Sequence, residues 1–450
     1  MHGRTIHKTL SPLLLALACL GAGPAGAQLA GEVEFSRGVG FAQTPGQAPR
    51  TLGKGLPLRE GDRLTTSEGA SAIIKLEDGT RMTVRPNSEI VLQQYQFKEN
   101  APDNSMLMQL VRGGFRAVTG LISKNSPNAA RIQTNTATIG IRGTDFDARL
   151  CTRDCGTESA RVTESARPNA VLASAKVFSI QGEVVAVDAS GQRRRLVDGG
   201  SIYPGDVIET AAGARGVLVF RDESRVSVGA SSRFRVDNFV FDDQNAGEGR
   251  FLASLLRGSI RAVTGLIAKA NNRNVGFATP TATIGIRGTE FTATCPGDCG
   301  AGNLSLFALL GSISFQQQGQ TALQLLQAGQ GLFITPTGFT PINTPPPSDA
   351  IPPGTVSIAP NTFGKQEVSD AQEGLFVFVR DGHIEVATVG DILHLGKGEA
   401  GFAGTNGETI RPTTIPKFID FDKLPLPTTK NPLLVSVLQD NNIKQSSVCK

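Results

Sequence analysis

Two stretches of this chain are near copies of each other, and this duplication constrains the fold more than any other feature. The run RAVTGLI at 116–122 returns at 261–267, and TATIGIRGT at 136–144 returns at 281–289. Weaker echoes keep nearly the same offset over about 110 residues. Chance matches would not stay in register over that length, so the pattern indicates a duplicated module. A unit of this size can bury its own core, which predicts tandem domains rather than short solenoid repeats.

The composition is typical of an all-β protein. The chain holds 52 Gly and 25 Pro, and many short runs of Val, Ile, Phe and Thr end at turn residues. Residues 72–84 have the pattern of a strand, a tight turn at Asp78-Gly79 and a second strand, and residues 216–228 repeat it. The sequence therefore predicts tandem β-rich modules, sandwich-like or roll-like, made of short strands and hairpins.

Turn residues and prolines suggest where the units begin and end. Eight prolines lie between Pro336 and Pro360, and such a segment should not form a ladder, so it is predicted to be an extended spacer. Residues 375–402 resemble 306–334, which predicts a lone third copy of the terminal hairpins. The expected order is signal peptide 1–27, first module 28–155, linker 156–175, second module with terminal hairpins 176–335, spacer 336–363, partial third hairpin unit 364–411 and proline-punctuated tail 412–450.

The first 27 residues have the parts of a secretory signal. Arg4 and Lys8 precede the apolar run 10–20, and Ala25-Gly26-Ala27 forms an A-x-A cleavage site. The apolar run is shorter than the roughly 20 residues that span a bilayer, and no later segment is apolar for long enough. We therefore expect cleavage after Ala27, a location in the periplasm or outside the cell, and no transmembrane segment in the mature chain. Cleavage lowers the net charge from +4 to +2, which gives no case for a nucleic-acid partner.

The cysteines form a repeated pattern. Cys151 and Cys155 follow the first TATIGIRGT element, and Cys295 and Cys299 follow the second. In an exported protein this spacing predicts one local disulfide in each copy, worth roughly 2 kcal/mol by loop-closure entropy. A Cys₄ metal site across both modules and a redox-active pair are the alternatives. Cys449 is left over, either free or paired between chains. We expect no metal ion and no cofactor.

The Arg-Gly-Thr element is the main candidate for a structural or binding role. It comprises Arg142-Gly143-Thr144 in the first module and Arg287-Gly288-Thr289 in the second, each after a β-branched run that contains a glycine. Such a glycine often marks a bulge. A buried arginine beside it would need a carboxylate or several carbonyls. It is either an internal anchor or a ligand-binding arginine; the candidate partners are Asp62, Asp206, Asp145 and Glu290.

The order of these motifs resembles the FecR domain family. In the first module the matching elements are 61–66, 78–79, 111–113 and 136–146, and in the second they are 205–210, 256–258 and 281–291. The resemblance covers roughly residues 30–335, with a partial echo at 375–402. It implies a periplasmic β-rich module that makes protein contacts. Founding members of that family lie beyond a membrane helix and relay a receptor's state to a sigma-factor regulator, whereas this chain is expected to begin with a cleaved signal, so only the binding-module part of the family's role carries over.

No residue pattern here indicates an enzyme. The motifs Gly-x-Ser-x-Gly, His-Glu-x-x-His and the phosphate-binding loop are absent, and His383 and His394 are expected to be surface strand residues. Two functions from different classes remain. One is a periplasmic protein-interaction or sensing module, and the other is an envelope-structural protein that binds peptidoglycan or surface polysaccharide. The chain has no Trp and only two Tyr, so aromatic platforms for sugars are scarce and an envelope protein is the favoured partner.

Overall fold

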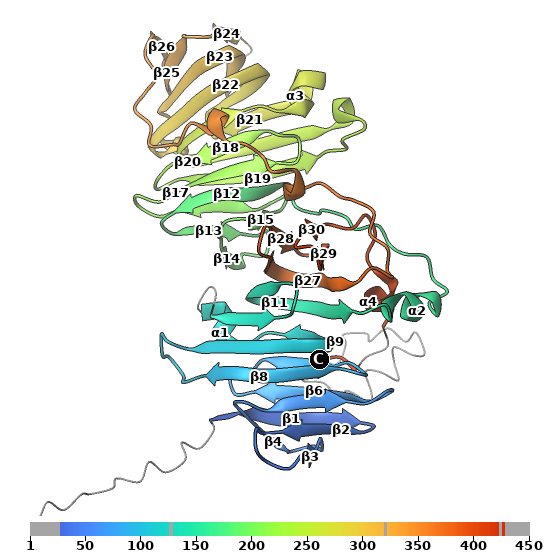
Figure 1. Cartoon of the computed structure of the whole chain (residues 1–450). Helices are drawn as coiled ribbons and strands as arrows, with labels where there is room; N and C mark the ends of the chain where they lie inside the picture. The colour runs from blue at the N-terminus through green and yellow to red at the C-terminus, as the bar shows by residue number, and fades with distance from the viewer. Residues whose placement is uncertain (1–27, 126–128, 319–321, 423–424, 428–450) are drawn as a thin grey trace, which may run out of the picture.

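The computed structural model describes residues 28–125, 129–318, 322–422 and 425–427. The chain is all-β, as its composition predicts, and these described residues form two sheets of 15 strands each. Figure 1 shows the two modules stacked end to end, with β1–β4 at one end and β23–β26 at the other. The expected signal peptide and Cys449 lie outside the described residues.

The first sheet is built mainly from the first half of the chain. Its elements up to residue 160 are β1 (Leu29–Arg37), β2 (Gly40–Gln43), β3 (Arg50–Thr51), β4 (Pro57–Arg59), β5 (Arg63–Thr66), β6 (Ser71–Leu76), β7 (Arg81–Val84), β8 (Glu89–Gln96), β9 (Ser105–Val118), α1 (Leu121–Asn125), β10 (Ala130–Gln133), β11 (Thr138–Cys151) and α2 (Cys155–Ala160). Four strands from the end of the chain complete it: β27 (Gly374–Ala387), β28 (Ile392–Gly396), β29 (Ala400–Gly404) and β30 (Thr409–Ile410), followed by α4 (Lys417–Asp420).

The second sheet repeats the same plan with consecutive strands. They are β12 (Ala175–Gln181), β13 (Val184–Val187), β14 (Arg193–Arg195), β15 (Ser201–Ile202), β16 (Val207–Thr210), β17 (Arg215–Phe220), β18 (Arg225–Val228), β19 (Arg233–Val240), β20 (Arg250–Val263), β21 (Val275–Thr279), β22 (Ala282–Asp298), β23 (Leu304–Gln317), β24 (Leu323–Gln327), β25 (Gly331–Thr335) and β26 (Gly338–Ile342), with α3 (Leu266–Ala270) after β20. The run 193–195, which has the composition of a solvated loop, is thus the short strand β14, paired with β13.

The long strands of each module bend, and their two halves pair in different parts of the sheet. The first half of β9 pairs with β8 and its second half with β7. In the same way β11 pairs with β10 and then with β9, and β27 pairs with β29 and then with β28. The sheet therefore folds back on itself around an apolar core, which in each module is filled by alternate strand residues.

A glycine with positive φ lies at each of these bends. In the first module these are Gly113 (φ +74°), Gly143 (+58°) and Gly382 (+89°), and in the second Gly258 (+82°), Gly288 (+59°) and Gly311 (+69°). The strand register shifts between Arg142 and Asp145, and again between Arg287 and Glu290. The bulge thus lies within the Arg-Gly-Thr element itself, because only glycine adopts this conformation at little cost.

The terminal hairpin unit differs from the prediction of a lone third copy. Strand β27 pairs with β11 of the first module over its whole length, as β23 pairs with β22 in the second module. Residues such as Leu375, Val377 and Ile384 belong to the first module's core. The first module is therefore discontinuous in sequence, and the second module is inserted between β11 and β27.

The connecting segments are also more ordered than their composition predicts. The proline-rich stretch contains β26, which pairs with β25 even at Pro341, because an edge position leaves the missing N–H facing away from the ladder. Farther on, Val356 packs on Val217 and Val219 of β17. The expected linker holds α2, and the start of the expected tail holds α4 with buried Phe418. The rest of that tail lies mostly outside the described residues.

The crowded bend at Gly382 provides a test of this architecture. A Cβ there would overlap the carbonyl oxygen of Gly143, whereas a Cβ at Gly407 (φ +84°) would meet nothing within 4 Å. We expect Gly407→Ala to lower the free energy of unfolding by about 1 kcal/mol through its positive φ alone. Gly382→Ala should lower it by about 3 kcal/mol because steric overlap is added. Equal losses of unfolding free energy for the two variants in urea denaturation would contradict a crowded bend at Gly382.

Candidate functional site

The threonine of the Arg-Gly-Thr element joins three strands. The hydroxyl of Thr119 accepts from the backbone N–H of Thr144 at 2.7 Å and donates to its carbonyl at 3.1 Å. The hydroxyl of Thr144 in turn donates to the carbonyl oxygen of His383 on β27 at 3.0 Å. Thr289 repeats this arrangement with Thr264 and with Ser312 on β23. The element thus attaches each terminal hairpin to the body of its module.

The arginine of the element does not use the partners expected from the sequence. Arg142 lies 3.6 Å from the carboxylate of Glu385 on β27, and its side chain is 18% exposed. Asp145 instead pairs with Arg116, and Glu290 pairs with Arg261. The side chain of Arg287 is outside the described part of the structure. Because Glu385 is more than 200 residues away in sequence, local spacing could not identify it.

Asp62 and Asp206 are fully buried and anchor the first turns of each module. Asp62 accepts from Arg50 at 2.6 Å and from the Thr44 hydroxyl at 2.6 Å. Asp206 accepts from Arg194 at 2.6 Å. Sequence reasoning missed both arginines, although Arg50 and Arg194 keep the repeat offset and that was the available signal. These aspartates are structural anchors within their modules and are not grouped around Arg142.

The two disulfides are present as predicted. Cys151 bonds to Cys155 and Cys295 to Cys299. Each closes a short loop just after β11 or at the end of β22. Within the described ranges, no group of three or more His, Cys, Asp and Glu side chains is placed to hold a metal ion.

The two modules are joined by a buried cluster of charges. The amine of Lys176 on β12 donates to Glu399 at 3.0 Å, and the guanidinium of Arg411 donates to the same carboxylate oxygen at 3.0 Å. All three side chains are at most 3% exposed. Burial lowers the pKa of Lys176 to about 8, against the raising effect of Glu399. Burial by itself would raise the pKa of Glu399, but the two cations hold it below its ordinary value.

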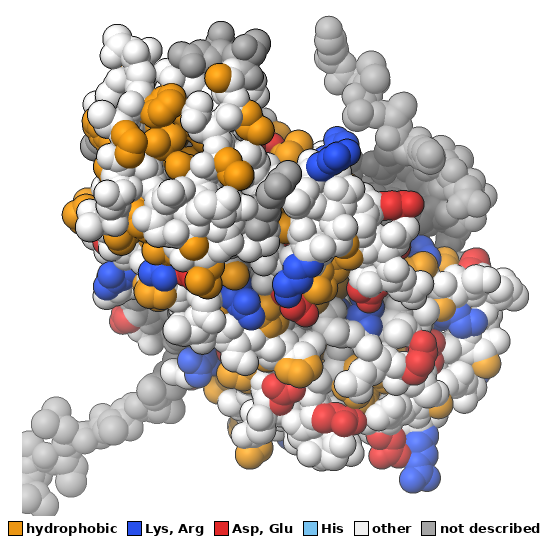
Figure 2. Space-filling view, turned by 90° about the horizontal axis from the view of Figure 1, so that it is seen from above, with side chains coloured by type: hydrophobic (Ala, Val, Ile, Leu, Met, Phe, Trp, Pro, Cys, Tyr) orange, Lys and Arg blue, Asp and Glu red, His pale blue; other side chains and the backbone are white. Residues whose placement is uncertain are grey.

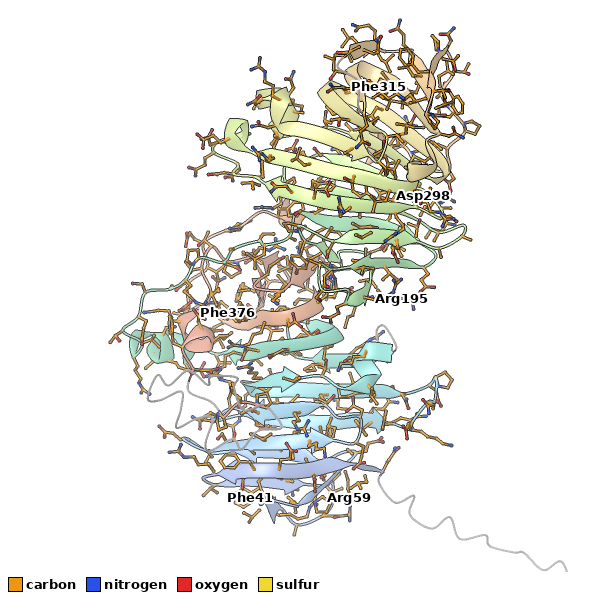
Figure 3. All side chains as sticks on the ribbon, turned by 180° about the vertical axis from the view of Figure 1, so that it is seen from behind. Phe41, Arg59, Arg195, Asp298, Phe315 and Phe376 are labelled. Carbon is orange, nitrogen blue, oxygen red and sulfur yellow. A yellow bond between two sulfur atoms is a disulfide. The ribbon has the colours of Figure 1, made fainter. Side chains whose placement is uncertain are left out.

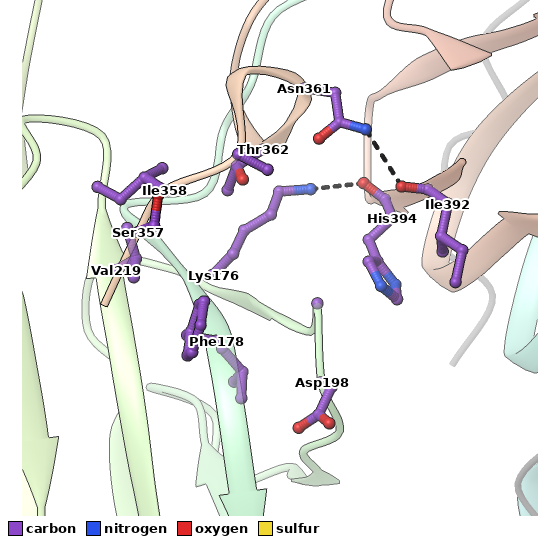
Figure 4. Close-up of a pocket in the computed structure, with 13 residues that line it drawn as sticks. Lys176, Phe178, Asp198, Val219, Ser357, Ile358, Asn361, Thr362, Ile392 and His394 are labelled. Carbon is purple, nitrogen blue, oxygen red and sulfur yellow. Dashed lines mark hydrogen bonds between the residues drawn. The ribbon is translucent and has the colours of Figure 1, made fainter. Parts of the chain in front are cut away.

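Beside this cluster lies a cavity of about 200 Å³. Figure 4 shows its walls: Lys176 and Phe178 from β12, Asp198, the segment 357–362, and Ile392 and His394 from β28. The amine of Lys176 also donates to the backbone carbonyl of His394 at 2.8 Å. Because this amine is held by two acceptors, it is positioned to join the modules rather than to attack a substrate.

His383 is not a surface residue, contrary to the prediction, and His394 is half-buried. His383 is buried, and its ring stacks on that of His394 with centroids 5.5 Å apart. Burial lowers the pKa of His383 well below its usual range, and the neighbouring positive charges add to this effect. Burial and Lys176 likewise lower the pKa of His394 to about 4. The error arose because the second module packs around these two rings, which local sequence does not reveal.

The opposite end of the second module is open and uncharged. The sequence contains no Lys, Arg, Asp or Glu between Gly300 and Ser348, a stretch that includes β23–β26. Four large apolar side chains are nevertheless exposed there: Leu310 (61%), Leu323 (64%), Leu325 (50%) and Phe339 (40%). We call these four residues the end face. Figure 2, seen from above, shows hydrophobic side chains gathered at this end of the molecule.

Comparison with known proteins identifies the modules. The model of the family described as FecR protein matches residues 62–166 and 206–306. One segment in each module thus matches the FecR family, and the two units are called the FecR modules from here on. The matched segments lie in the two sheets, and the first stops before β27–β30, so the match does not reach the hairpins that complete the first FecR module.

Curated proteins and solved structures were also compared with this chain. A comparison with curated proteins found no match. Among solved structures, two crystal structures of a putative anti-sigma factor from Parabacteroides distasonis ATCC 8503 are similar at 13% identity and a TM-score of 0.25. Each alignment covers 31% of this chain and 60% of that one, so this chain spans less than two thirds of that protein. In the described residues, no helix is long and apolar enough to cross a membrane.

Replacing the buried carboxylate of Glu399 should destabilise the contact between the two FecR modules. We expect Glu399→Gln to lower the free energy of unfolding by about 3–5 kcal/mol, because Lys176 and Arg411 would keep their charges without a counter-ion. The matched control is Glu373→Gln, whose partner Arg153 is 87% exposed and whose loss should cost less than about 1 kcal/mol. Chemical denaturation of both variants measures the difference, and similar losses would contradict a stabilising role for the cluster.

The histidine pair should make the fold sensitive to acid. Both folded-state pKa values lie below the unfolded value of about 6.5, so unfolded histidine binds a proton first as the pH falls. Stability from this pair is complete above pH 6.5 and is lost toward pH 4, by up to about 1.4 kcal/mol per pH unit for each histidine. The charged groups that face the pair are Lys176, Arg142, Arg194, Arg411 and Glu399.

Denaturation midpoints at pH 6.5, 5.5 and 4.5 measure this dependence. The double variant His383→Phe/His394→Phe keeps flat rings in the same place, and it should flatten the slope that the histidines contribute. A double variant with the slope of the parent protein would show that carboxylates alone cause the acid sensitivity.

Proposed function

We propose that this chain is an exported, non-enzymatic FecR-type protein that binds a protein partner in the periplasm or elsewhere in the cell envelope. The observation that carries the proposal is the end face. An exposed surface that lacks charge and presents four large apolar side chains is unusual for a monomer and typical of an interaction site.

Three further observations support this function. The FecR family match is consistent with a sensing or regulatory module. The two disulfides suit an oxidising compartment, in keeping with the signal peptide expected at 1–27. The buried charged groups at the junction are held in fixed pairs and the cavity there offers one carboxylate, Asp198, which supports binding rather than catalysis.

A photo-crosslinking amino acid at position 323 would test the proposal in living cells. We expect it to capture one or a few envelope proteins in near-stoichiometric yield. The matched control is position 240, where Val240 is 57% exposed on β19 of the same module. Capture of glycan strands without a dominant protein, or equal capture from both positions, would contradict the proposed function and favour a wall-binding role.

A further inference from the structure

Part of the end face has a counterpart inside this molecule that is covered. Strand register makes β24 of the second module equivalent to β28 of the first: Leu323 corresponds to Ile392, and Leu325 corresponds to His394. Ile392 and His394 both line the cavity where the second module rests on the first, but Ile392 stays 49% exposed, whereas the ring of His394 lies against Gly199. At His394 the junction therefore displays what covers this position of a FecR module, namely the starting strands of another FecR module.

The contact at the junction centres on one glycine turn. The N–H of Gly199 donates to the carbonyl of Val177 at 2.8 Å, and in the first module the N–H of Gly55 donates to that of Val33 at 2.8 Å, so the two glycines are equivalent. Gly199 is buried, and a Cβ there would overlap the ring of His394. Gly55 is exposed, and a Cβ there would meet nothing within 4 Å. The ring of His394 thus lies against Gly199, whereas the equivalent Gly55 is exposed.

Other positions at the start of the first module are open in the same way. Leu29 is 50% exposed where its equivalent Ala173 is buried, and Phe41 is 38% exposed where its equivalent Val185 is 9% exposed. We call Leu29, Phe41 and Gly55 the start face. Figure 3 shows Phe41 at one end of the molecule and Phe315 of β23 near the other. The molecule therefore carries two complementary apolar faces at opposite ends.

We propose that the end face of one copy of this chain docks on the start face of a second copy, in the geometry of the internal junction. This inference rests on the proposed function and names the partner. Leu325 takes the place of His394 above Gly55. The polar positions are equivalent as well. Glu32 of the first module occupies the position of Lys176 in the second, and Gln330 of the second module occupies the position of Glu399 in the first. At the junction Lys176 of the second module donates to Glu399 of the first. In the docked pair the amide of Gln330 would instead donate to the carboxylate of Glu32, so the donor and the acceptor exchange sides.

This contact joins different faces of the two copies. An association between unlike faces does not close on itself unless its rotation forms a ring, so it produces chains of increasing length. The same start-on-end stacking that joins the two FecR modules would then continue from one molecule to the next.

Sedimentation velocity of the purified, exported full chain tests the proposal. We expect the mean sedimentation coefficient to rise with concentration, and we expect this rise to be lost in Leu325→Asp and in Leu29→Asp. Val240→Asp is the matched control and should behave as the parent. Circular dichroism and the unfolding midpoint verify that each variant folds.

Mixing the two defective variants gives the decisive result. Leu325→Asp keeps its start face and Leu29→Asp keeps its end face, so an equimolar mixture should form dimers that do not grow. A parent protein that stays monomeric, or Leu29→Asp that dimerises alone, would overturn head-to-tail docking. If the parent is monomeric while position 323 still captures a different envelope protein in cells, this inference fails and the proposed function stands.

Discussion

The outer edge of β11 is the constraint on which the rest of the structure depends. A long strand with an unpaired edge leaves a row of backbone N–H and C=O groups without partners, and natural folds cover such an edge. In the second FecR module the next segment of chain, β23, supplies the cover at once. In the first module the next segment is the second module itself, and the cover arrives only with β27. The chain must therefore return, and its return places β28 against β12.

This return explains why buried charge is found at the junction. Lys176, Glu399 and Arg411 come from segments that are distant in sequence and meet only when the second module is seated between β11 and β27. A buried ion cluster adds little stability compared with apolar packing, but it penalises any arrangement that leaves one member unpaired. At this position such a penalty favours one orientation of the two modules. The stacked histidines lie beside this cluster, and burial lowers the pKa of each, so the stability of the same contact falls as the pH falls.

The two ends of the molecule differ in chemistry although they share one backbone plan. The terminal hairpins of the first module carry charged residues, including Asp381, Glu385 and Lys397, and the second module covers part of them. The equivalent hairpins of the second module carry none, and their large apolar side chains Leu310, Leu323 and Leu325 are exposed. Loss of charge on an open apolar face raises the cost of leaving it in water, and this is the physical reason to look for a partner there.

The sequence by itself determined the duplicated β modules and the two disulfides, because each depends on residues within one repeat or on repeat offset. The bulge that it predicted at Gly140 and Gly285 lies instead at Gly143 and Gly288, where the strand crosses to its second partner. It did not reveal that β27 completes the first module, since the hairpin pattern of 375–402 is the same whether it stands alone or pairs with β11. The partners of Arg142 and the burial of His383 follow from that pairing and were missed for the same reason. The run without charge from 300 to 348 was visible in the sequence, but only the tertiary structure decided that it is exposed. Local patterns specify strands and turns, whereas the choice of which edges meet is made by long-range packing.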